Sequence, residues 1–142
     1  MSLRDKAADI WAGEKADNEG LNAEVQRLGS LTLQQLAAEV MVKGFGPGGP
    51  AAAAGYADPE YIGAVFSQPY QGRDYDTAAD ASLMEMVNEG IQVLEHACLV
   101  RPVFHGQGGD NEVHYSLGWG ATRLGRTALE QQTVERILSG GA

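Results

Sequence analysis

The stretch LVRPVFHGQGGDNEVHYSL, residues 99–117, constrains the fold of this chain more than any other segment. Its centre, GGDN, has the composition of a tight turn, and apolar and polar residues alternate on either side of it. Alternation with a period of two is typical of strands that expose one face to solvent. We therefore predict an antiparallel β-hairpin with strands at about 99–105 and 112–117.

The alternation also predicts a register for this hairpin. If residues 109–110 form the two-residue turn, Phe104 faces Tyr115 across the ladder, and His105 faces His114. Phe104 and Tyr115 then belong to an apolar face of the hairpin. We expect helices to cover this face, because an isolated two-stranded hairpin is marginally stable in water.

The remainder of the chain is predicted to be helical. Residues 1–28 have apolar residues at helical spacing, with an interruption expected at 17–20. One apolar stripe of this segment comprises Leu3, Ala7, Ile10 and Trp11. Thr32 and Gln35 have the spacing of a capping box, which marks the start of the next helix. Further helix starts are predicted at Asp58, at Asp76 or Thr77, and at Thr122.

A length of 142 residues predicts a single domain, 1–142, that is large enough to bury a hydrophobic core. Within it, residues 44–57 are rich in Gly, Pro and Ala, and we predict a mobile loop there. Gly44, Gly46 and Gly49 match the spacing of a dinucleotide-binding loop, but this segment follows a predicted helix rather than a strand. We therefore interpret the segment as a linker and not as a phosphate site.

The single cysteine, Cys98, cannot form an internal disulfide and is expected to be buried. The sequence has no apolar run of the roughly 20 residues that a membrane span needs. It also has no basic and then apolar leader at its start. We therefore expect a cytoplasmic protein with no membrane partner.

The net charge of −9 argues against a general nucleic-acid binder, because phosphates and carboxylates repel each other. This charge is unevenly distributed. Residues 1–98 contain fifteen Asp and Glu against six Lys and Arg. Residues 99–126, which include the predicted hairpin, contain three Arg against one Asp and one Glu, a sum of +1. The hairpin region is thus the only segment that is not acidic.

Two segments resemble the winged helix-turn-helix domain of repressors of the multiple-antibiotic-resistance and phenolic-acid-decarboxylase types. IQVLEHACLVRP resembles the end of the recognition helix and the first wing strand. VHYSLGWGATRLGRTALEQ resembles the second wing strand and the helix that follows it. The resemblance covers about residues 83–138. It implies a mostly helical α+β, winged-helix-like fold of four to five helices and one two-stranded antiparallel hairpin.

The chain departs from the pattern of this family in three places. Cys98 stands where the family has glycine, and residues 118–120, Gly-Trp-Gly, are additional. The connection between the second helix and the candidate recognition helix contains a glycine- and proline-rich stretch and a small extra helix instead of a tight turn.

In this family the recognition helix enters the major groove, and Lys and Arg supply most phosphate contacts. Residues 74–100 contain six Asp and Glu and no Lys or Arg. We therefore expect a non-enzymatic winged-helix regulatory or adaptor protein that acts mainly through protein–protein contacts, with a second copy or another protein. A DNA-binding transcription regulator that uses wing arginines is the alternative. The candidate contact residues for DNA or a protein partner are Asn88, Gln92, Arg101, His105, His114, Arg123 and Arg126.

Enzyme and metal functions are not expected. The sequence has no catalytic motif of the nucleophile-elbow, zinc-protease or phosphate-loop kind, and we expect no cofactor. His105 and His114 are secondary metal candidates, but the cysteine and histidine spacings do not match those of structural zinc sites. This histidine pair could instead sense pH. A small-molecule sensor is the further alternative, with a pocket lined by Trp11, Tyr56, Tyr61, Phe66, Tyr70 and Trp119.

Overall fold

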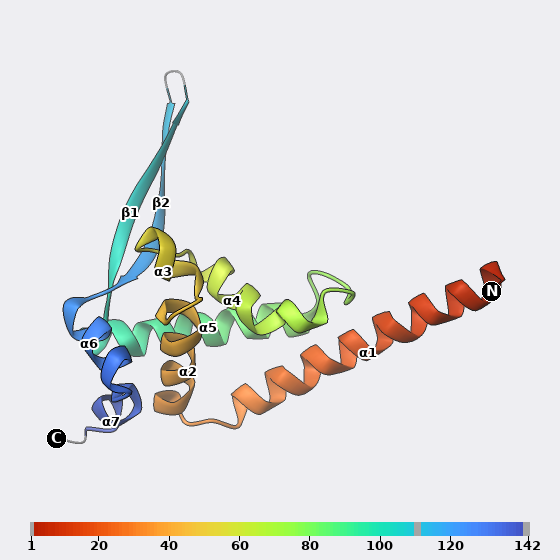
Figure 1. Cartoon of the computed structure of the whole chain (residues 1–142), viewed down its shortest axis with the longest axis horizontal. Helices are drawn as coiled ribbons and strands as arrows, with labels where there is room; N and C mark the ends of the chain where they lie inside the picture. Colours follow the sequence, from red (N-terminus) through yellow and green to blue (C-terminus); the bar gives the residue numbers. More distant parts are fainter. Residues whose placement is uncertain (1, 110–111, 141–142) are drawn as a thin grey trace.

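A computed structural model describes residues 2–109 and 112–140 of the chain, with the backbone alone described for 107–109 and 112–116. The elements, in chain order, are α1 (Leu3–Gly29), α2 (Leu33–Phe45), α3 (Pro50–Ala54), α4 (Pro59–Ser67), a 3-10 turn η1 (Gln68–Tyr70), α5 (Ala78–His96), β1 (Val100–Gly109), β2 (Glu112–Ala121), α6 (Arg123–Gln131) and α7 (Val134–Leu138). Figure 1 shows a helical body from which α1 and the β1–β2 hairpin project in different directions.

The predicted class is confirmed: the protein is mostly helical, with one two-stranded antiparallel sheet. The described part of the chain has seven α-helices rather than four to five. Two differences account for this. The segment 44–57 contains α3, and the predicted final helix is divided into α6 and α7, because Gln132 adopts a left-handed conformation with φ of 56°.

Helix α1 is continuous, and the predicted interruption at 17–20 is wrong. The residues that predicted it contact the segment after η1. Asp17 Oδ2 accepts a hydrogen bond from the Gly72 N–H at 2.8 Å, and Asn18 Oδ1 accepts one from the Asp74 N–H at 2.8 Å. Polar residues that lower helix propensity therefore serve here to bind a neighbouring segment.

The core lies where α2, α4 and α5 pack against one another, and α7 covers the other side of α2. The predicted capping box at the start of α2 is present. The Gln35 N–H donates to Thr32 Oγ1 at 3.1 Å, and the Thr32 N–H donates to Gln35 Oε1 at 3.0 Å. The largest fully buried side chains are Leu21, Leu28, Val40, Met41, Ile62, Val87, Ile91, Leu94, Leu99 and Val100. Within the described residues, no helix has both the length and the apolarity needed to cross a bilayer.

The segment 44–57 is more regular than the predicted loop. Proline at the first position of α3 is compatible with a helix start, and Ala51 is buried. The segment ends in an isolated bridge, in which Ala57 and Trp119 exchange two backbone hydrogen bonds of 2.9 Å. This bridge attaches the segment to the edge of the hairpin.

The hairpin is present, but its predicted register is wrong by two residues. Phe104 lies opposite Leu117 instead of Tyr115, and His105 lies opposite Ser116. The predicted turn comprises Gly109 and Asp110. Asp110 and the next residue, Asn111, lie outside the residues that the structure describes. Since side chains alternate with a period of two, this shift keeps the predicted residues on the same faces.

The predicted helical cover over the apolar face of the hairpin is absent at its described positions. Phe104 is 73% exposed and Leu117 is 43% exposed. The base of the hairpin approaches the body through glycines instead. A Cβ at Gly118 would contact Tyr56 and Asp58, and a Cβ at Gly120 would contact the Gly55 carbonyl oxygen. Gly118 and Gly120 thus allow the close approach of backbone segments.

Cys98 is exposed, and the prediction of burial is wrong. It follows α5 with φ of 63°, in the left-handed region, and β1 begins two residues later. This is the conformation in which helices commonly end on glycine.

Candidate functional site

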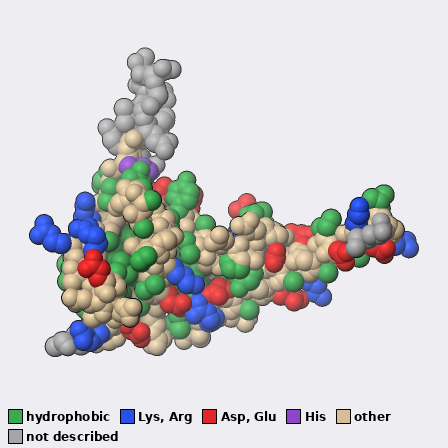
Figure 2. Space-filling model, in the orientation of Figure 1, with side chains coloured by type: hydrophobic (Ala, Val, Ile, Leu, Met, Phe, Trp, Pro, Cys, Tyr) green, Lys and Arg blue, Asp and Glu red, His purple; other side chains and the backbone are tan. Residues whose placement is uncertain are grey.

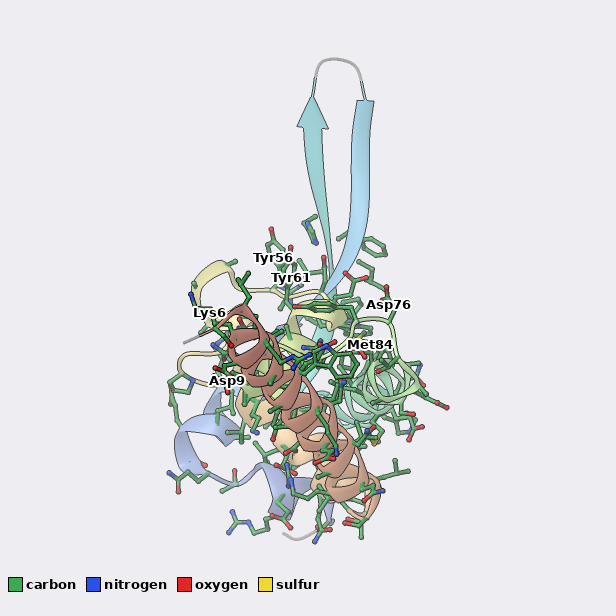
Figure 3. All side chains as sticks on the ribbon, turned by 90° about the vertical axis from the view of Figure 1, so that its right-hand side faces the viewer. Lys6, Asp9, Tyr56, Tyr61, Asp76 and Met84 are labelled. Atoms are coloured by element: carbon green, nitrogen blue, oxygen red, sulfur yellow. The ribbon has the colours of Figure 1, made fainter. Side chains whose placement is uncertain are left out.

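The base of the hairpin joins the helical body through His105. His105 Nε2 lies 3.0 Å from Asp58 Oδ1, and its ring stacks on Tyr56 with the centroids 4.3 Å apart. Asp58 and Tyr56 belong to the connection between α3 and α4, whereas His105 lies in β1. Figure 3 shows Tyr56 and Tyr61 beside the base of the hairpin, where it meets the body. These contacts fix the position of β1 on the body.

Asp58 has a different role from the predicted one. It precedes Pro59 as the N-cap residue of α4, as predicted, but its side chain makes no capping hydrogen bond. The carboxylate interacts with His105 instead. The sequence pattern predicted Asp58 as a helix cap, whereas its side chain connects the hairpin to the body.

A pocket of about 320 Å³ lies beside this contact. Its lining residues are Pro50, Ala54, Tyr56, Ala57, Asp58, Tyr61 and His105. Of the six aromatic residues predicted to line a pocket near the wing, only Tyr56 and Tyr61 do so here. Phe66 belongs to the core, and Trp11 is exposed on α1. The structure thus brings two of the predicted aromatic side chains together with one predicted contact residue.

The three predicted arginines lie near the junction of β2 and α6. Arg101 pairs with Gly120 across the ladder, and Arg126 Nη1 donates to the Ala121 carbonyl oxygen at 3.0 Å. Arg123 is the first residue of α6. All three side chains are exposed. Figure 2 shows Lys and Arg side chains gathered at this junction, beside the base of the hairpin.

The exposed face of α5 is acidic. Asn88 and Gln92 lie on it as predicted, and the neighbouring exposed carboxylates are Glu85, Glu89 and Glu95. Gln92 also lines a second pocket, of about 370 Å³, between α5 and α7. The predicted contact residues therefore fall on separate surfaces, since His105 belongs to the pocket at α3 and α4.

His114 is in β2, but its side chain lies outside the described part of the chain. Its backbone lies opposite Gln107, so the predicted pairing of His105 with His114 is wrong. Among the described residues, His, Cys, Asp and Glu form no cluster of three or more that could hold a metal ion.

The first half of α1 carries a second candidate contact surface. The predicted apolar stripe, which we call the α1 stripe, comprises Leu3, Ala7, Ile10 and Trp11. Leu3 is 85% exposed, Ile10 is 69% exposed and Trp11 is 75% exposed. The helical spacing predicted this stripe, but its exposure follows only from the position of α1 relative to the body (Figure 1).

Comparison with known proteins identifies no relative: no family model, no curated protein and no solved structure matches the chain.

Proposed function

We propose that this chain is a non-enzymatic winged-helix regulatory or adaptor protein that acts mainly through protein–protein contacts. The order of its elements supports the winged-helix part of the proposal. Three mutually packed helices, α2, α4 and α5, precede a hairpin and a closing helix, as in winged helix-turn-helix domains. In this proposal α5 is the recognition helix and β1–β2 is the wing.

The observation that carries the protein-contact part is the exposed α1 stripe. Large apolar side chains gathered on a protruding element mark interaction surfaces more often than single exposed apolar residues do. Aromatic residues such as Trp11 are also enriched where binding energy concentrates. The surface of α5 argues in the same direction, because its exposed carboxylates would face phosphates in a major groove.

DNA binding through the wing is the second candidate, and the exposed Arg101, Arg123 and Arg126 favour it. These three side chains could contact phosphates beside the groove that the wing approaches. Such contacts would give binding with a strong dependence on salt.

Titration of a labelled random-sequence duplex separates the two functions. We expect no binding at micromolar protein and about 50 mM salt, where phosphate contacts are strong. Salt-dependent binding that is lost in R101A/R123A/R126A, but kept in K15A/K43A/R136A, would overturn the proposal in favour of DNA binding. The second variant is a matched control, because it removes three cations that lie on α1, α2 and α7, outside the wing.

A further inference from the structure

We propose that two copies of this chain associate through antiparallel packing of the first halves of their α1 helices. The basic first turn of each helix then lies against an acidic region at the middle of the other helix. This inference rests on the proposed function, in which protein contacts are primary, and it names a second copy as the partner.

The buried face of α1 continues beyond the body. Helix α1 has 27 residues and is therefore about 40 Å long. Its buried residues, Leu21 and Leu28, lie in the second half. At about 100° per residue, Leu3, Ala7 and Ile10 lie on the same face as Leu21 and Leu28. One apolar face thus packs on the body in the second half of the helix and is exposed to solvent in the first half (Figure 1).

An acidic region lies where α1 leaves the body, which we call the acidic junction. It comprises Glu14 and Asp17 on α1 and Asp74 in the segment before α5, where the Asp74 N–H donates to Asn18 Oδ1 at 2.8 Å. Hydrogen bonding to Asp74 and the negative charge of Asp74 raise the pKa of the Glu14 carboxyl. Two carboxyl groups therefore share one site, and a cation there would relieve their repulsion.

The cations next to Glu14 and Asp74 in the sequence, Lys15 and Arg73, interact with other carboxylates. Lys15 Nζ lies 4.0 Å from Glu19 Oε1, on the exposed surface of α1. Arg73 Nη2 lies 3.0 Å from Asp80 Oδ1, at the start of α5. The acidic junction thus keeps a negative charge that an external basic group can complement.

The basic group that fits is at the start of α1 itself. Arg4 and Lys6 flank the α1 stripe on its two sides, at about 100° per residue. The Asp5 carboxylate of the same turn is engaged in the helix cap, where it accepts from the Ser2 N–H at 3.3 Å. Asp9 lies on the opposite face of the helix from the stripe. The charge beside the stripe in this turn is therefore positive.

The spacing of these charges requires a second molecule. Arg4 and Asp17 are about 20 Å apart along one helix, so neither Arg4 nor Lys6 reaches the acidic junction of its own chain. In an antiparallel pair that crosses near Ile10, each first turn lies beside residues 14–17 of the other copy. The contact is then made twice, as a two-fold symmetric dimer requires. Ile10 and Trp11 lie at its centre.

A small residue beside this centre, Ala7 on the α1 stripe, allows the helices to approach each other closely. Only three large apolar side chains of each copy, Leu3, Ile10 and Trp11, are exposed on this half of the helix, so the interface is small and the association is weak. We therefore expect a dissociation constant in the micromolar range.

Sedimentation velocity of the full chain, from about 1 to 100 µM, tests this dimer. We expect a shift from monomer to dimer over this range. Ile10→Asp should weaken association at least about ten-fold, because it places a charge in the centre of the interface. Ala12→Asp is the matched control, since it introduces the same residue on the opposite face of α1 and should leave association unchanged. Circular dichroism checks that both variants remain folded.

A charge exchange tests the antiparallel orientation. R4E/K6E should weaken association about ten-fold, and adding Glu14→Lys to this variant should restore part of the loss. A chain that stays monomeric at 100 µM, or an equal effect of Ile10→Asp and Ala12→Asp, would overturn the proposed interface. Neither result bears on the duplex titration, so failure of the dimer and failure of the proposed function are distinguishable.

Discussion

Cys98 holds a conformation that suits glycine better than any other residue. Its φ of 63° costs a residue with a side chain about 1–2 kcal/mol. Cys98→Gly should therefore raise the free energy of unfolding by about 0.5–1 kcal/mol. This gain is smaller than the strain that is relieved, because glycine loses more conformational entropy on folding than cysteine does. Urea unfolding measures this difference. Cys98→Ala keeps the Cβ and should give no gain, and an equal gain in both variants would contradict this explanation.

Gly125 is required for a different reason, the packing of α6 on the end of α5. A Cβ at this position would clash with the Leu99 carbonyl oxygen and press against Met41. Gly125→Ala should lower the free energy of unfolding by about 2–3 kcal/mol because the backbone of Leu99 must shift. Gly13→Ala is the control: this exposed position in α1 has free space, and alanine there should add up to about 1 kcal/mol. Denaturant unfolding compares the two, and a neutral Gly125→Ala would contradict the packing described.

At the scale of the element, the start of α5 is held by Asp80. Burial raises the pKa of this carboxyl, but hydrogen bonds from Arg73 and Thr77 outweigh that effect, and the net shift is downward. The carboxylate therefore stabilises the fold above the unfolded pKa of about 3.9, and this stability is lost as the pH falls through the lower folded pKa.

Asp80→Asn should lower the free energy of unfolding at pH 7 by about 1–2 kcal/mol, because the ion pair and the cap are weakened. The difference from the unsubstituted chain should shrink below about pH 4, because Asp80 takes up its proton in the unfolded chain at a higher pH than in the folded chain. Urea unfolding at pH 7 and pH 3 measures this. A difference of the same size at both pH values would show that the charge of Asp80 is not the cause.

The attachment of the hairpin depends on Asp58 and His105. A double-mutant cycle with Asp58→Ala and His105→Ala should give a coupling energy of about 1 kcal/mol, because the two side chains share one hydrogen bond. His105→Phe should keep the stacking on Tyr56 but lose the coupling. Thermal or urea unfolding supplies the four free energies, and additive single effects would contradict a direct contact.

Local sequence signals predicted elements better than their contacts. The helix starts and the hairpin were predicted from signals between residues that are close in the sequence. These signals are the pair Thr32 and Gln35, the cap Thr122, and the alternation around GGDN. The register of the hairpin was not predicted correctly, because the glycines and polar residues of GGDN are compatible with more than one two-residue turn. The contact of His105 with Asp58 spans 47 positions, and it depends on α3, which was not predicted.

At the scale of the whole molecule, the proposed function is supported by how charged and apolar side chains are distributed over the surface. The acidic surface of α5 disfavours DNA, while α1 presents an apolar stripe, a basic first turn and an acidic junction. The composition alone indicated the acidic character of residues 1–98. It could not indicate that the first half of α1 extends beyond the body, because this depends on where the body ends.

Sedimentation of the full chain with a labelled random duplex, at about 50 mM salt, tests the central claim most directly. Protein and duplex are followed at separate wavelengths in the same cell. We predict that the protein sediments as a concentration-dependent dimer while the duplex sediments alone. A duplex that sediments together with the protein, and separates from it as salt is raised, would contradict the claim that this chain acts through protein contacts.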